Sequence, residues 1–241
     1  YVQAVIKPDG TKVAEFSKGP NSGWVFRVNG EFPDVAMQDY QISDGDVIEV
    51  LFTANYMDEP GLFLPFTDVN NHWAYSAIKR VYNRGLMLGV SDTRFAPNQA
   101  LSRAMLVTVL WRMAGSPAAA GNGGFTDLRA EWYRAAAVWG RQNGIVAGTS
   151  RTTFAPDKAV TKEQAAALLA RFAKAMGASA RDDAKPVYVA ECSAWAQSGV
   201  QEAFGYDVCD SYVCLTAPKD TATRAELAHM LRLLSNRIQK V

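Results

Sequence analysis

The sequence predicts a mainly α-helical protein, in which three helix–loop–helix repeats follow a small N-terminal β domain. Three observations support this fold class. A stretch that begins FTDVNNHW at Phe66 returns as FTDLRAEW at Phe125, with an offset of 125 − 66 = 59 that holds without a gap. Both copies contain apolar residues at helical spacing, whereas residues 1–56 contain short apolar or alternating runs broken by turns. A fixed period of this length is typical of repeated units that bury their apolar faces on one another.

The composition of the 241 residues is that of an ordinary globular protein, without an apolar run long enough to span a membrane. The net charge of +1 is unevenly distributed: residues 1–60 carry 4 basic and 10 acidic side chains, and residues 61–241 carry 21 basic and 14 acidic ones. The repeat region is therefore the half suited to an anionic partner. The chain opens on Tyr1 in strand-like sequence without a signal peptide, which we expect to say little about export.

Residues 1–56 are predicted to form strands, with a tight hairpin turn at Asn29-Gly30. This segment resembles the second half of transcobalamin C-terminal-like β-grasp domains. The matching residues are Ser22-Gly23-Trp24, Val28-Asn29-Gly30, Tyr40 and Asp44-Gly45-Asp46. The resemblance implies that opening strands and a helix precede Tyr1, or that another segment completes the sheet. We expect a protein or small-ligand partner for this domain, although residues 1–56 offer no recognisable ligand for cobalamin, and likeness of fold does not assign function.

A predicted linker at residues 57–65 leads into the repeats, which we place at 66–118, 125–178 and 187–238. In each repeat, a first helix with one apolar face precedes a loop with an Ala-Pro pair. Five residues after that proline, a Ser or Thr begins the second helix in all three copies, as 97 to 102, 156 to 161 and 218 to 223 show. The third copy is degenerate: it lacks the loop glycines, and Ala190 lies near the position that holds aspartate in the other two.

The second helices begin with related tetrapeptides: Ser102-Arg103-Ala104-Met105, Thr161-Lys162-Glu163-Gln164 and Thr223-Arg224-Ala225-Glu226. Ser/Thr-x-x-Glu/Gln is a capping box, which copies two and three complete and copy one does not. The box does not explain the basic residue, because a cation in the first turn opposes the helix dipole by about 0.3–1 kcal/mol. Free backbone N–H groups beside a cation form an anion site, so we expect a carboxylate or phosphate here. The alternative is that the cation pairs with Asp68 or Asp127.

A tryptophan heads each first helix: Trp73, Trp132 and, with a one-residue shift, Trp195. Core packing is the commoner role for such a residue, and the alternative is a stacking surface for a sugar ring. The loop glycines also have two interpretations, because they either supply positive φ or let a ligand approach the backbone. They are Gly85, Gly89, Gly144 and Gly148.

The ordered motifs FTDV…HWA…G…G…FAP…SRA, FTDL…EW…G…G…FAP…TKEQ and AP…TRAE resemble tandem S-layer homology domains. The resemblance implies three repeats packed as a pseudo-threefold bundle with grooves between units. It implies that these grooves bind anionic, often pyruvylated, secondary cell wall polysaccharide and anchor a surface protein non-covalently. The implied location is extracellular, in the cell wall or S-layer of a bacterium. The ligand-binding residues it implies are Arg103, Lys162, Arg224, Asp68, Asp127, Trp73, Trp132, Gly89 and Gly148.

We expect no enzymatic activity, since His72 and His229 have no evident nucleophile partner. We also expect no cofactor and no metal, since Cys192, Cys209 and Cys214 do not have metal-ligand spacing. A local disulfide in an exported protein and three buried thiols both fit these cysteines. No nucleic-acid partner is expected, because basic residues are not clustered along one helix. Three alternatives remain: a wall-associated enzyme or a ligand-binding protein in which the repeats are only the attachment module, and a self-assembling surface-layer protein.

Overall fold

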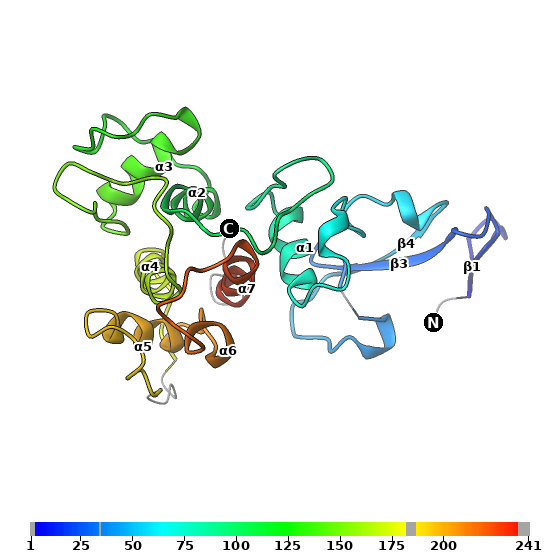
Figure 1. Cartoon of the computed structure of the whole chain (residues 1–241). Helices are drawn as coiled ribbons and strands as arrows, with labels where there is room; N and C mark the ends of the chain where they lie inside the picture. The colour runs from blue at the N-terminus through cyan, green and yellow to red at the C-terminus, as the bar shows by residue number, and fades with distance from the viewer. Residues whose placement is uncertain (1–2, 34, 182–186, 236–241) are drawn as a thin grey trace. The chain divides into compact units, whose positions relative to one another are not determined.

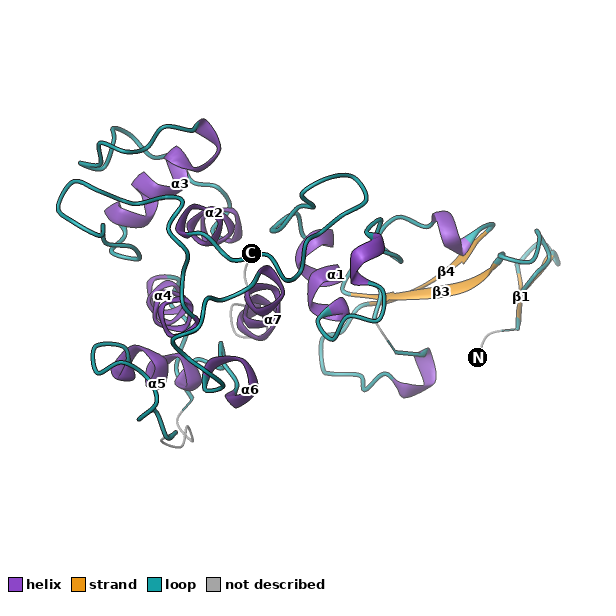
Figure 2. Cartoon of the chain, in the orientation of Figure 1, coloured by secondary structure: helices purple, strands orange, loops and turns teal. Residues whose placement is uncertain are grey.

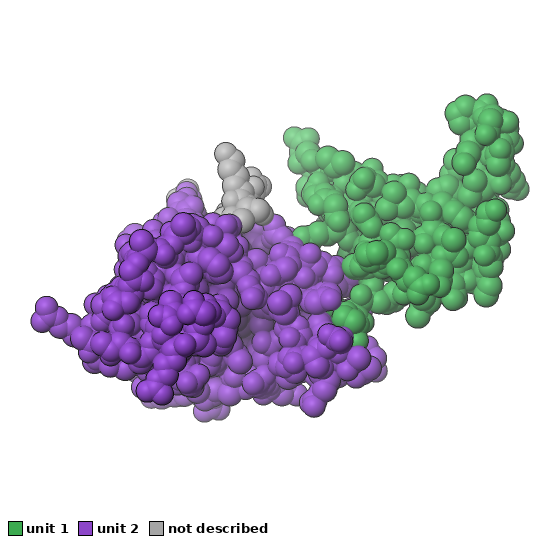
Figure 3. Space-filling model, turned by 90° about the horizontal axis from the view of Figure 1, so that it is seen from above, with its two compact units in different colours: residues 1–65 green, residues 66–241 purple. Residues whose placement is uncertain are grey.

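The computed structural model describes residues 3–33, 35–181 and 187–235, and it divides the chain into two compact units, residues 1–65 and 66–241 (Figure 3). Within the described residues, the strands lie in the first unit and the α-helices in the second (Figure 2). The prediction of a mainly helical chain with a small N-terminal β region is confirmed. None of the described helices has the length and apolar character needed to cross a bilayer.

The described residues of the first unit form two antiparallel two-stranded sheets. In one, β1 (Ala4–Ile6) pairs with β2 (Lys12–Ala14); in the other, β3 (Gly23–Val28) pairs with β4 (Ile48–Thr53). The register of the second sheet sets Trp24, Phe26 and Val28 opposite Phe52, Val50 and Ile48. One face of this sheet is therefore apolar, as expected for a half-buried pair of strands.

Asn29 and Gly30 form the predicted turn, with φ of 52° and 80°. The turn does not lead into a long second strand, because only an isolated bridge joins Val28 to Glu31 and a proline follows at position 33. The Asn29 side chain instead accepts a hydrogen bond from the Val47 backbone N–H at 2.9 Å. The partner of β3 is thus β4, which lies later in the sequence.

The segment at residues 57–65, predicted as a linker, belongs to the first unit. A short 3-10 helix, η2 (Tyr56–Asp58), begins it. The guanidinium of Arg27 donates to Glu59 at 3.0 Å, and the backbone N–H of Tyr56 donates to Asn21 at 2.9 Å. These contacts join the segment to β3 and to the loop that precedes this strand.

The second unit contains three two-helix repeats. The first helices are α1 (Tyr75–Asn83), α3 (Glu131–Gln142) and α5 (Gln197–Gly205), and the second helices are α2 (Arg103–Met113), α4 (Lys162–Ala175) and α7 (Arg224–Ser235). A 3-10 turn, η3 (Thr67–Val69), precedes α1, and a four-residue helix, α6 (Ser211–Cys214), lies in the third repeat. The predicted apolar faces are buried, with Ile78, Leu110, Leu169 and Leu231 at 0% exposure.

Each second helix packs against the first helix of a different repeat. Helix α2 packs on α3, α4 packs on α5, and α7 packs on α1 (Figure 1). The second helix of each repeat therefore lies against the next repeat, and the last repeat returns to the first. This arrangement buries an apolar face that a single repeat leaves exposed.

Backbone hydrogen bonds close the same cycle. The Leu101 N–H donates to the Ala222 carbonyl at 2.8 Å, the Ala222 N–H to Val160 at 2.8 Å, and the Val160 N–H to Leu101 at 2.9 Å. All three residues precede a second helix by the same distance in their repeats and are fully buried. The constant proline-to-cap spacing thus brings three short segments into mutual register.

The predicted helix caps are present. Ser102 Oγ accepts from the Met105 N–H at 3.2 Å, and Thr161 with Gln164 completes a reciprocal capping box. Thr223 and Glu226 form the same box in the third repeat. Of the two possibilities for the cysteines, the local disulfide is confirmed. Cys209 is bonded to Cys214, and Cys192 is free and buried.

Candidate functional site

The cation at the start of α2 reaches into the loop of the second repeat. Arg103 donates from Nε to the Phe154 carbonyl at 2.8 Å and from Nη2 to the Ala147 carbonyl at 2.7 Å. Its guanidinium lies 4.9 Å from the centre of the Phe154 ring. Burial lowers the pKa of Arg103, and the carboxylate of Asp127 opposes that shift. The junction of repeats 1 and 2 therefore contains a positive charge, and the negative charge of Asp127 compensates it at a distance.

Arg224 repeats this arrangement at the junction of repeats 3 and 1. It donates from Nε to the Phe95 carbonyl at 3.0 Å and from Nη2 to the Leu88 carbonyl at 2.6 Å. The whole residue is only 7% exposed. Burial lowers the pKa of Arg224, and Asp68 opposes this lowering. Among the described residues, its direct hydrogen-bond partners are carbonyls, so this buried guanidinium keeps the capacity to attract an anion.

Lys162 differs from the two arginines. Its ammonium donates to the Thr216 carbonyl at 3.0 Å and pairs with the carboxylate of Glu226 at 3.0 Å. The charge at the junction of repeats 2 and 3 is therefore neutralised in place. Copies one and two have Met105 and Gln164 where the third has Glu226, so the equivalent carboxylate is absent from the other two boxes.

The backbone N–H groups at the starts of these helices are occupied, so the expectation of an anion site built from free N–H groups is wrong. The Arg103 N–H donates to Lys158 at 3.0 Å, and the Ala104 N–H donates to Pro156 at 2.9 Å. The corresponding bonds run from Lys162 to Asp220, Glu163 to Pro218, Arg224 to Gln99 and Ala225 to Pro97. The neighbouring repeat supplies these carbonyls, which satisfy N–H groups that a helix start leaves without an intrahelical partner.

Asp68 and Asp127 hold the Phe-Ala-Pro loops of their own repeats. Asp127 accepts from the Phe154 N–H at 2.9 Å and from the Ala155 N–H at 2.7 Å, and Asp68 does the same at the equivalent residues. Ala155 has φ of 57°, a conformation in which alanine is strained. Burial alone raises the pKa of Asp127, but the two backbone N–H groups and the charge of Arg103 outweigh it and lower the pKa.

Because its folded pKa is depressed, Asp127 contributes stability above its unfolded pKa and loses it as the pH falls below about 4. We expect Asp127→Asn to destabilise the protein at pH 7 by about 1–2 kcal/mol, since the amide nitrogen cannot accept from the second N–H. Thermal unfolding between pH 3 and 7 measures both effects. The variant is expected to lose less stability on acidification than wild type, and parallel pH profiles would contradict this role.

The loop glycines divide into two kinds. Gly85 and Gly144 have φ of 67°, which is the left-handed conformation expected after a helix end. Gly89 and Gly148 have a different reason: a β-carbon on Gly148 meets the Ser150 carbonyl at 2.3 Å and the Thr153 carbonyl at 2.5 Å. Close packing within the loop thus accounts for the second pair.

The tryptophans lie at the surface, so core packing is the wrong interpretation for them. Trp73 is 49% exposed, Trp132 52% and Trp195 58%. The stacking role therefore remains open for all three. At Trp73, the structure adds Tyr212 and His229 from the third repeat. Sequence reasoning missed this contact, because Tyr212 lies in the degenerate stretch that has no counterpart in the other repeats.

Of the nine predicted residues, the arginines and the aspartates are brought together across junctions between repeats. Arg103 is brought near Asp127, and Arg224 near Asp68, although each pair belongs to two different repeats. Lys162 has Glu226 as its partner. The cation of one repeat thus acts together with the aspartate of the next.

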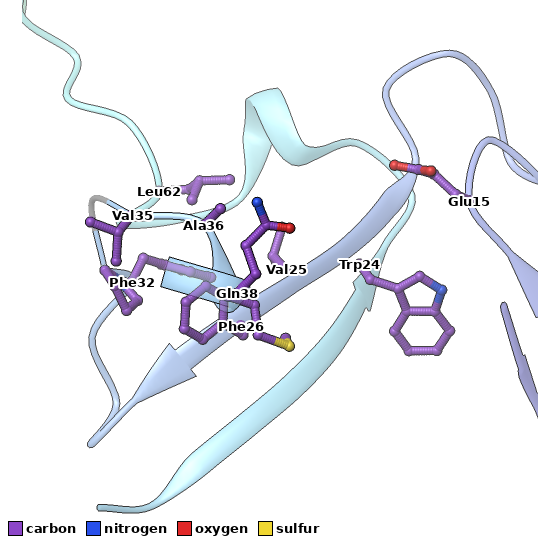
Figure 4. A pocket seen from close by; sticks show the side chains of 11 residues that line it. Glu15, Trp24, Val25, Phe26, Phe32, Val35, Ala36, Gln38 and Leu62 are labelled. Carbon is purple, nitrogen blue, oxygen red and sulfur yellow. The ribbon is translucent and has the colours of Figure 1, made fainter. Parts of the chain in front are cut away.

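The first unit has a separate pocket of about 290 Å³ (Figure 4). Apolar side chains form most of its wall, among them Phe26, Phe32, Val35 and Leu62. A pocket of this size suits a small apolar group or a side chain of a partner. The expected protein or small-ligand partner of this unit stays a prediction.

The second unit defines a class of protein, helical-repeat modules whose units close into a cycle. Within this class, residues 65–104 and 124–166, in the first two repeats, match the S-layer homology domain family as two tandem segments. Residues 9–54 match a domain of unknown function, DUF4430. S-layer homology domains anchor proteins to the cell wall, which indicates a location at the cell surface or in the wall.

Curated relatives share this region. The chain is 26% identical over 176 residues to an exoglucanase, XynX, of Acetivibrio thermocellus, which covers 69% of the chain and 16% of that protein. It is 25% identical over 195 residues to an amylopullulanase of Thermoanaerobacterium thermosulfurigenes, covering 76% of the chain and 10% of that protein. It is 34% identical over 98 residues to the surface-layer 125 kDa protein of Lysinibacillus sphaericus, covering 40% and 8%. The chain thus spans a small part of each relative.

Proposed function

We propose that the repeats anchor a bacterial surface protein non-covalently by binding anionic secondary cell wall polysaccharide at the junctions between repeats. The observation that carries the proposal is an arginine at each of two junctions, half-buried Arg103 and buried Arg224, which donates to carbonyls and has no carboxylate in direct contact among the described residues. A ligand carboxylate, such as a pyruvate ketal, supplies the missing negative charge. The closed cycle of helix contacts supports a pseudo-threefold arrangement with equivalent binding positions.

The three junctions are expected to differ in strength. Arg103 and Arg224 face carbonyl groups, whereas Lys162 is already paired with Glu226. A ligand anion at the junction of repeats 2 and 3 has to compete with that carboxylate. We therefore assign the anionic sugar first to the junctions of repeats 1 with 2 and 3 with 1, where α2 packs on α3 and α7 packs on α1. An exposed tryptophan, Trp132 or Trp73, lies at or just before the start of α3 and α1.

Sedimentation with purified wall sacculi tests this function. The full chain is expected to bind sacculi that carry pyruvylated polysaccharide, and removal of the ketals by mild acid is expected to weaken binding by about tenfold or more, the loss of a charge-assisted contact. Sacculi stripped of the polysaccharide serve as the control. Equal binding to all three preparations would contradict a role for the anion.

The relatives support one alternative, in which the repeats are the attachment module of a larger wall-associated enzyme. Two of them are named as an exoglucanase and an amylopullulanase, and the chain matches only a small share of each. Under this proposal the chain itself has no catalytic activity. Release of soluble sugar from wall polymer by the purified chain is the measurement that would overturn it.

A further inference from the structure

An aromatic corner lies at the junction of repeats 3 and 1. The ring centre of Trp73 is 5.8 Å from that of Tyr212, and the two planes meet at 74°. The other neighbour, His229, lies 5.5 Å from Trp73. Tyr212 is 67% exposed, so the corner is open to solvent although its residues come from two repeats.

The other tryptophans do not have such a corner within the described part of the chain. Trp132 contacts only the ring of Tyr133, which follows it in the same helix and is buried. Trp195 has no ring partner among the described residues. Among the described residues, a tryptophan that meets aromatic rings of another repeat is therefore found only where the degenerate third repeat packs on the first.

Helix α6 holds Tyr212 in place without burying it. Four residues are too few for a helix to be stable alone. The disulfide between Cys209 and Cys214 closes this turn, and Asp210 caps it by accepting from the Val213 N–H at 2.9 Å. The second oxygen of Asp210 lies 2.6 Å from Nε2 of His229, which joins the cap to α7. The loop that lost the usual glycines thus contains a fixed support for one exposed tyrosine.

We propose that Trp73 and Tyr212 form a subsite for an uncharged pyranose ring of the wall polysaccharide, and that the disulfide-closed helix α6 positions Tyr212. The apolar C–H face of a sugar ring stacks on one aromatic plane while the second plane borders its edge. Arg224 and His229 both belong to α7, so the subsite and the anion position lie at the same junction and can bind different sugars of one chain. This inference rests on the proposed function.

The test compares variants in titrations with soluble wall polysaccharide. Tyr212→Ala is expected to raise Kd about fivefold to tenfold, the loss of one aromatic contact. Tyr212→Phe keeps the ring and is expected to stay within about twofold of wild type. The matched control is Tyr188→Ala, an exposed tyrosine of the same repeat that has no ring contact within the described residues. It is expected to bind like wild type.

Reduction of the disulfide tests the positioning role. Dithiothreitol is expected to weaken polysaccharide binding by the wild-type protein by about the same factor as the Tyr212→Ala substitution does. It is expected to leave the Kd of the Tyr212→Ala variant unchanged. Equal weakening of both proteins would overturn the positioning role. Binding of Tyr212→Ala equal to wild type would overturn the subsite while leaving the anchoring function in place. Failure of wild type to bind the polysaccharide at all would instead reject the proposed function, and the subsite with it.

Discussion

Replacing Arg103 and Arg224 together by glutamine is expected to weaken binding to wall sacculi by about 100-fold or more, since a hydrogen bond to a charged group contributes about 1.5–3 kcal/mol. Both guanidinium groups are held by carbonyls of the adjacent repeat and keep their charge near the junction. Sedimentation at constant ionic strength, over a range of protein concentrations, gives the apparent affinity.

Two controls separate charge from folding. Arginine-to-lysine changes at the same positions keep the charge, and Lys162 shows that a lysine reaches a carbonyl of the next repeat. Because an ammonium cannot reproduce both carbonyl contacts of a guanidinium, those variants are expected to bind more weakly than wild type but more tightly than the glutamine pair. Lys162→Gln is expected to weaken binding to sacculi by about threefold or less, because Glu226 already neutralises that ammonium. Thermal melts establish that each variant is folded at the assay temperature. A glutamine pair that binds as well as Lys162→Gln would reject the arginines as ligand contacts.

Gly148→Ala is expected to lower the free energy of unfolding by about 3 kcal/mol, because the added methyl group overpacks a closed loop. Its β-carbon meets two loop carbonyls and comes within 2.9 Å of the Phe125 ring. None of these groups moves without disturbing the loop that Asp127 holds. For a unit of this size we expect the melting temperature to fall by about 6–12 °C, which differential scanning calorimetry measures.

Gly144→Ala is the matched comparison. A β-carbon there meets nothing within 4 Å, but φ is +67°. This variant therefore experiences only backbone strain, about 1 kcal/mol. Equal shifts for the two variants would show that conformation, and not the contact with the carbonyls, makes glycine necessary at position 148.

The helices and their caps follow from short-range sequence. Thr161 and Gln164 are three residues apart, so their reciprocal hydrogen bonds depend on one helical turn and are visible in the pattern. The buried faces of α2, α4 and α7 likewise follow from 3.6-residue periodicity. In the first unit, the turn at Asn29-Gly30 was predictable, but the pairing of β3 with β4 was not, since it depends on contacts across a long loop.

The sequence alone thus predicted the repetition, the helix positions, the caps and the kinds of residue at the site. It did not predict which repeat's carbonyls each cation contacts. Arg103 acts on carbonyls more than 40 residues away, and Arg224 on ones more than 120 away. Long-range packing occupied the N–H groups that the local pattern left free, gave Lys162 a carboxylate partner, and brought Tyr212 to Trp73. The physical reason is that these contacts form only when each repeat packs on the next and the third packs on the first.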